Sequence, residues 1–253
     1  MSPLPRALSA ELLKLRGTLA AWMCLIAPAT VVALYVLQVS FSKIVPGSAD
    51  NAAESWFFLT QSILVLWSFL MLPLFVTLQS ALLAGLEHGD GQWKHLLALP
   101  VPRRVHYLAK LLLLTAMVLA AFVVLLLLIP LGGWLLMLLK PAFGLHGMPP
   151  WTGLITSAAA SFAAAWLIIA LQTWIAIRWR SFTVAVAVGM SATVVGFLVG
   201  QSERFGPWYP WSLPMQVFAG HGEHTAFVVF LGVFGGLVVT LMGLADYLRR
   251  EVS

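Results

Sequence analysis

The sequence predicts an all-α integral membrane protein in which six transmembrane helices form a single domain. Of its 253 residues, 61% are hydrophobic and only 9% are charged, and the mean hydropathy is +0.96. This leaves too little polar surface to cover a soluble globule. Charge-free runs of about 20 residues or more recur, which is enough for a helix to cross a hydrocarbon core of about 30 Å. The runs lack the alternation of barrel strands, so the spans are expected to be helices.

The expected spans fall in six hydrophobic segments of the chain. They are residues 18–40, 55–86, 111–139, 153–177, 182–201 and 225–245. The second and third exceed one crossing, and Pro73 and Pro130 inside them are candidate kink sites, as is Pro28 in the first. The connection at residues 202–224 contains FGPWYPWSLP, which suits either an interfacial aromatic belt or a re-entrant cap over the bundle.

The basic residues are distributed unequally between the two sides of the predicted bundle. One side holds eleven Lys and Arg residues, namely Arg6, Lys14, Arg16, Lys94, Arg103, Arg104, Lys110, Arg178, Arg180, Arg249 and Arg250. The other side holds Lys43, Lys140 and Arg204. Because positive loops stay inside, both termini are expected in the cytoplasm. The net charge of +5 is therefore an orientation signal, and no nucleic-acid partner is expected.

The predicted spans contain no Asp, Glu, Lys, Arg or His. Ion-coupled transporters and intramembrane metallo- or aspartyl proteases place such groups within the bilayer, so their absence argues against these classes. His221, Glu223 and His224 lack the spacing of a metalloprotease helix, and no metal site or catalytic residue is expected. No lysine follows a glycine, so the phosphate-binding G-x-x-x-x-G-K-[ST] loop is absent and this chain is expected to bind no nucleotide cofactor.

Polar and small residues within the spans fall on stripes. In the second span Gln61, Ser68 and Gln79 lie within about 20° of one line at 100° per residue, so they should face protein or a passage. Helix packing and substrate lining are both open for this stripe. Stripes of small residues predict close helix packing on the fifth and sixth spans. Their members are Gly189, Thr193, Gly196 and Gly200 on the fifth and Gly232, Gly236 and Gly243 on the sixth.

The longest expected cytoplasmic loop covers residues 87–110. Trp93, Leu96 and Leu97 share one face of a short amphipathic helix, and a second helical start bearing Arg103 runs into the third span. The first of these helices can lie among lipid headgroups or form a peg for a soluble partner.

A second amphipathic element is expected at residues 5–16, before the first span. Leu8, Leu12 and Leu15 recur at helical spacing, opposite Glu11 and Lys14. This pattern predicts an elbow helix at the cytoplasmic surface.

Three motifs resemble the membrane subunits of type-2 ABC exporters. They are SAELLKLRGTLAAWMCLIAP near the start, E-x-x-x-G-x-W-K-x-L-L-x-L-P-V-x-R from Glu87 to Arg103 with Lys110 beyond it, and the late YPWSLP. The branch they resemble most comprises permeases that protect producers from lantibiotics and bacitracin-like peptides.

The resemblance implies a dimer of six-helix bundles in the bacterial cytoplasmic membrane, each docked on a separate ATP-binding subunit that holds ATP and Mg. In that family the loop between the second and third spans forms a coupling helix. Carried over, the coupling residues would be Glu87, Trp93, Lys94, Leu96, Leu97 and Arg103, supported by Glu11 and Lys14. Candidates for the substrate path are Gln61, Ser68 and Gln79.

The function expected from these observations is that of a permease subunit which exports a hydrophobic or amphipathic compound, such as a peptide antibiotic, a drug or a lipid-like molecule. Missing intramembrane charges suit a transporter that receives its energy from outside the bilayer. One alternative is a non-transporting membrane scaffold or maturation factor. Another is a membrane-embedded lipid-modifying enzyme, which should show clustered Asp, Glu, His or Ser near one interface, whereas this chain has only scattered ones.

Overall fold

The computed structural model describes residues 3–15, 17–42, 52–88, 102–179, 181–219 and 223–249, and within these ranges it contains helices and loops but no strand. Six helical segments are long and apolar enough to cross a membrane. They are α2 (Leu19–Phe41), α3 (Ala52–Leu66) with η1 (Trp67–Met71) and α4 (Leu72–His88), α6 (Arg103–Leu139), α7 (Trp151–Ala164) with α8 (Trp166–Arg178), α9 (Phe182–Gly200), and α11 (Thr225–Arg249). The all-α fold with six spans is confirmed.

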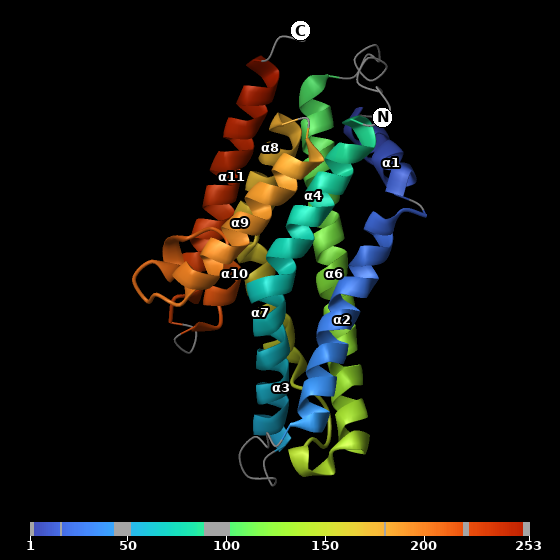
Figure 1. Ribbon diagram of the computed structural model, residues 1–253, viewed down its shortest axis with the longest axis vertical. Helices are drawn as coiled ribbons and strands as arrows, with labels where there is room; N and C mark the ends of the chain where they lie inside the picture. Colours follow the sequence, from blue (N-terminus) through green and yellow to red (C-terminus); the bar gives the residue numbers. More distant parts are fainter. Residues whose placement is uncertain are drawn as a thin grey trace.

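The remaining elements are short, and they are α1 (Pro3–Leu15), η2 (Pro141–Phe143), η3 (Gly206–Trp208) and α10 (Leu213–Gln216). Both termini lie at the same end of the bundle (Figure 1). The described part of the connection between α9 and α11 lies at mid-height, whereas α2, α3 and α6 continue to the far end (Figure 1).

The amphipathic helix α1 has a different buried face from the one predicted. Leu8 and Leu15 pack on the core, but Glu11 joins them at 8% exposure while Leu12 is 49% exposed. The reason is that α1 lies against α6, and Lys14 Nζ stands 2.9 Å from Glu11 Oε1, so the carboxylate is paired where it is buried. The prediction that Glu11 lies opposite the apolar face is wrong.

The second span is interrupted by η1, a π-helical segment just before Pro73. Proline donates no N–H and its ring clashes with the carbonyl four residues earlier, here Phe69 inside η1, so a wider turn relieves the crowding. The extra residue in the turn rotates everything after it by about 100° relative to a regular helix. The single line predicted for Gln61, Ser68 and Gln79 therefore does not hold.

The third span begins as predicted, because the helical start after Pro102 runs into it and α6 extends from Arg103 through Pro130 to Leu139. The fourth span divides at Ala165, which has no breaking residue to predict it. Gly232 of α11 approaches the backbone of Ala164 here so closely that a β-carbon would not fit.

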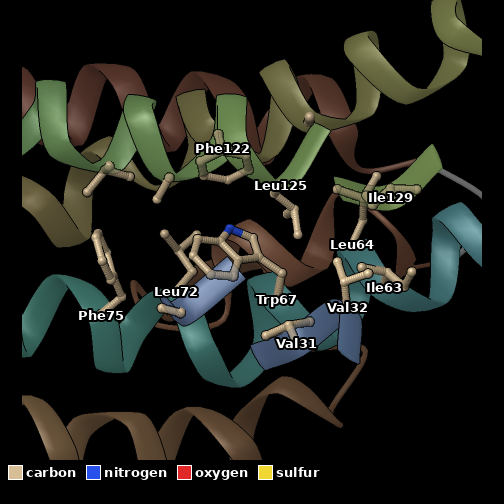
Figure 2. Packing of buried hydrophobic residues seen from close by; sticks show 14 of the residues in the cluster. Val31, Val32, Ile63, Leu64, Trp67, Leu72, Phe75, Phe122, Leu125 and Ile129 are labelled. Atoms are coloured by element: carbon tan, nitrogen blue, oxygen red, sulfur yellow. The ribbon is translucent and has the colours of Figure 1, made fainter. Parts of the chain in front are cut away.

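The hydrophobic core is centred on Trp67 of η1, which is completely buried. Figure 2 shows this indole between Phe75 and Leu72 on its own span, Phe122 and Leu125 of α6, and Val31 of α2. Its ring lies 5.8 Å from that of Phe122 at 83°, an edge-to-face arrangement. The interrupted span is thus held against α6 at the point of interruption.

Candidate functional site

Three elements, η1, α6 and α7, meet in the middle of the bundle at a small polar and aromatic cluster, which we call the central junction: Trp67, Ser68, Phe122, Ser161 and Phe162. Ser68 Oγ of η1 lies 2.7 Å from Ser161 Oγ of α7, and Ser161 Oγ donates to the carbonyl of Pro214 in α10 at 3.2 Å. A hydroxyl has one proton, so Ser68 donates to Ser161. The interrupted second span, α7 and the segment before α11 are therefore linked by hydrogen bonds.

The aromatic side of the central junction connects it to α6. The Phe122 ring lies 5.8 Å from Trp67 and 5.7 Å from Phe162, with nearly perpendicular planes in both pairs. Trp67 begins the π-helical segment and Phe162 precedes the break at Ala165. One residue of α6 thus contacts both spans beside their irregular backbone.

A second buried polar contact joins α4, α8 and α9. Gln172 Nε2 donates to Thr77 Oγ1 at 2.8 Å, and both side chains are at most 2% exposed. Gly189 of α9 lies directly on this pair, and a β-carbon there would overlap Gln172 and Thr77. The hydroxyl of Thr193 donates to the Gly189 carbonyl at 2.7 Å.

The other small-residue positions also face neighbours within the same chain. Gly196 lies against Tyr209 and Trp211, Gly200 against Ser212, Gly232 against Ala164, and Gly236 against Trp166. Both stripes therefore bring α9 and α11 close to the rest of this bundle.

The segment between α9 and α11 is a packed cap. Gln216 Nε2 donates to the carbonyl of Gly200 at 2.8 Å, and the Tyr209 hydroxyl donates to that of Ala192 at 2.9 Å. Burial raises the pKa of the Tyr209 phenol. Trp211 is 8% exposed, whereas Trp208 is 64% exposed. The segment therefore packs on its own bundle, as expected for a cap, and leaves Trp208 exposed.

At the end that carries the termini, Lys110 is buried at 7% exposure between α4 and α6. Its Nζ donates to the carbonyl of Leu83 in α4 at 3.4 Å, and a cation near the carbonyl end of a helix is favourable. The sequence places Lys110 at the edge of a solvated loop. Its burial was missed because it depends on how α4 packs beside α6.

Asp246 forms another contact at this end that sequence reasoning missed. Its Oδ2 accepts from Trp174 Nε1 at 3.1 Å and lies 3.7 Å from Arg178 Nε. These contacts fasten the end of α8 to α11. The residues are 72 positions apart in the first pair, and no spacing rule connects them.

Comparison with known protein families decides the identity of the chain. A family model described as ABC-2 family transporter protein matches residues 7–196. The chain belongs to this family. The matched residues run from α1 into α9 and include both sides of the loop between α4 and α6. No curated protein and no solved structure matches the chain.

The ABC-2 chain is a multi-pass membrane permease, and this family implies a separate ATP-binding partner. Of the residues expected to contact that partner, the structure describes three side chains. Glu11 and Lys14 form the ion pair of α1, and Arg103 is the half-buried first residue of α6. The backbone of Glu87 is in the last turn of α4, while its side chain lies outside the described part. Trp93, Lys94, Leu96 and Leu97 also lie outside the described residues.

The three candidates for the substrate path of the ABC-2 permease have different surroundings. Gln79 is completely buried, and its Nε2 donates to the carbonyl of Ala20 in α2 at 2.8 Å. Ser68 is equally buried in the central junction. Gln61 of α3 is half-buried. Within the described residues, no three His, Cys, Asp or Glu side chains are close enough to hold a metal ion.

Proposed function

We propose that this ABC-2 permease exports a hydrophobic or amphipathic compound, with ATP and Mg bound by a separate subunit that docks on the loop between α4 and α6. The substrate class favoured by the sequence motifs is a peptide antibiotic. The basic residues favour cytoplasmic termini in a bacterial cytoplasmic membrane. One observation carries the proposal, namely that Lys110 joins the two helices that enter and leave this loop.

Through the Lys110 contact, a movement of the loop would be passed on to the bundle. Because the ammonium group on α6 holds the Leu83 carbonyl of α4, a displacement of the loop acts on both helices. α1 lies against the same α6, so a subunit that touches α1 and the loop together can move α6 relative to its neighbours. In this proposal, docking of the ATP-binding subunit is coupled to the bundle because it changes the position of α6 relative to α4 and its other neighbours.

The surroundings of Gln79 favour a role in transmitting motion between helices over a role in lining a substrate path. Its amide bonds the first turn of α2, close to where α1 ends. A side chain with no exposed surface cannot contact a passing molecule in this conformation. Gln61 is half-buried, and it is the candidate we retain for the substrate path, beside a second copy of the permease.

Docking of the ATP-binding subunit is tested by affinity purification of the full-length permease from its native membrane. The double variant Trp93→Ala with Leu97→Ala should lose the ATP-binding subunit, because it removes the apolar face of the loop. A matched control is Trp134→Ala with Leu138→Ala, which repeats the same residue types and the same spacing on α6 at exposed positions. Retention of the subunit by the loop variant would contradict docking at this loop, and absence of any such subunit from the unmodified permease would refute the proposed function.

The substrate path is tested separately by peptide-stimulated ATP hydrolysis of the purified complex. Gln61→Leu should change the stimulation by a peptide antibiotic and leave basal hydrolysis unaltered, because it changes only the half-buried face of α3. Gln79→Leu should lower basal hydrolysis, because it removes the link to α2. Unchanged stimulation in Gln61→Leu would argue for a packing role.

A further inference from the structure

A hydrophobic groove of about 660 Å³ lies between α2 and α6 in the half of the bundle far from the termini. Figure 1 shows these two helices side by side in that half. The groove is lined by Ala29, Val32, Ala33, Val36, Leu37, Ser40 and Phe41 of α2 and by Leu128, Leu131, Gly132, Leu135 and Leu139 of α6. We propose that this groove binds one acyl chain of a membrane phospholipid from the leaflet opposite the termini.

The floor of the groove is closed by tight contact between the two helices. Val32 and Val36 are each 6% exposed, and a β-carbon on Gly132 would come within 2.8 Å of Val32 and 3.2 Å of Val36. Leu37 and Leu131, at 54% and 52% exposure, stand at the sides. Glycine and valine in the floor with leucine at the rim produce a concave surface.

The end of the groove is fixed by Lys140. Its Nζ donates to the carbonyls of Val39 at 3.0 Å and Ser42 at 2.8 Å, which are at the end of α2. Lys140 directly follows the last residue of α6, so these bonds hold the ends of both helices together. The groove is thereby a fixed feature of the bundle and not a variable gap between two independent helices.

The dimensions of the groove match one lipid chain. From Ala29 to Phe41 the lining of α2 extends about 18 Å at about 1.5 Å per residue, close to the roughly 15 Å of one hydrocarbon leaflet. At about 30 Å³ for a group the size of a water or methylene, the groove holds roughly 20 such groups. This is close to the number of carbon atoms in one acyl chain, and a much shorter ligand would leave part of the groove empty.

The chemistry of the lining favours a lipid chain over a helix from another protein. Helices associate in membranes through small residues and interhelical hydrogen bonds, and this groove has small residues in Ala29, Ala33 and Gly132 but offers few groups for hydrogen bonds between helices. Its one polar side chain, Ser40, donates to the carbonyl of Val36 at 2.7 Å. An acyl chain needs only van der Waals contact, which a narrow apolar groove supplies along its whole length.

The proposal is tested with the full-length permease in phosphatidylethanolamine and phosphatidylglycerol vesicles that contain phosphatidylethanolamine with a photoactivatable diazirine in one acyl chain. After illumination, mass spectrometry maps the labelled residues. Leu37 in the groove should be labelled at least about threefold more than Leu25, because a bound chain stays longer than bulk lipid. Leu25 is a fair reference, since it lies on the same helix at 46% exposure against 54%.

Two variants make the test specific. Ala33→Phe fills the groove and should reduce its labelling to the level of Leu25, while Ala21→Phe makes the same change at an exposed position of α2 outside the groove and should leave it unchanged. Leu37→Trp fills the groove from its rim and should likewise reduce labelling at Leu131 if Ala33→Phe does not fold. Equal labelling of groove and reference in the unmodified permease overturns the proposal, as does a groove without label. The first result would indicate ordinary surrounding lipid, and the second a covering protein.

Discussion

Gly189→Ala tests the packing of α9 on the buried Thr77–Gln172 pair. The added methyl group would overlap both side chains of that pair, which is hydrogen-bonded at 2.8 Å and has no exposed surface to move into. Either α9 moves outward or the hydrogen bond between α4 and α8 breaks. The variant should therefore be destabilised although alanine is the better helix former.

The size of the effect follows from three contributions. Overpacking of a dense core costs about 1–3 kcal/mol, and loss of an interhelical hydrogen bond in a membrane protein costs about 0.6–1.7 kcal/mol. Replacement of glycine by alanine within a helix returns about 1 kcal/mol. The free energy of unfolding of Gly189→Ala should therefore fall by about 0.6–3.7 kcal/mol.

The measurement is reversible unfolding in mixed micelles, with increasing denaturing detergent, followed by tryptophan fluorescence. Gly153→Ala is the matched control, because it is also a helical glycine but has no atom within 4 Å of its would-be β-carbon. It should be neutral or more stable by up to about 1 kcal/mol. In a Gln172→Ala background the cost of Gly189→Ala should shrink. If Gly189→Ala is as stable as Gly153→Ala, the steric argument is refuted.

Three further predictions concern single contacts. Lys140→Met should lower the free energy of unfolding by about 1–3 kcal/mol in the same assay, because two carbonyls at the end of α2 lose a charged donor. Lys140→Arg keeps a charged donor and should retain most of this stabilisation. Equal losses in the two variants would contradict the role of the charge. Ser68→Ala and Ser161→Ala should couple by about 0.5–1.5 kcal/mol in a double-mutant cycle, and additive effects would exclude their bond. Burial raises the pKa of the Tyr209 phenol in the folded state. The contribution of the neutral phenol to the free energy of unfolding is therefore complete below the unfolded pKa of about 10, and it is lost as the pH rises through the higher pKa of the folded state. Between about pH 9 and pH 11 the unfolding midpoint should fall less in Tyr209→Phe than in the unmodified permease. Equal pH dependence in the two proteins would contradict the assignment of this effect to Tyr209.

The number and type of the spans could be predicted because they depend on local composition. A helix must satisfy its own backbone in lipid, so each charge-free run identified one span whatever its neighbours were. The stripe on α9 was predictable for the same reason, since Gly189, Gly196 and Gly200 keep helical spacing in an uninterrupted helix.

The relations between helices could not be predicted from spacing. The π-helical segment before Pro73 changes the direction of every later side chain, so Gln79 meets α2, while Ser68 within the segment meets α7. At 100° per residue Glu11 lies only about 40° from Leu15, so its place beside the buried face follows from spacing, whereas its burial against α6 does not. The burial of Lys110 depends on where α4 ends relative to α6.

The continuous course of α6 past the central junction has a consequence for how the permease can deform. The helix is about 55 Å long at about 1.5 Å per residue, and its Phe122 contacts the irregular turns of both interrupted spans. If the second and fourth spans bent at these two turns, both would move about the same residue, Phe122, and the backbone hydrogen bonds of α6 would stay intact. Such bending would have to repack the ring contacts around Phe122, the hydroxyl pair beside it and the close approach of Gly232 to Ala164.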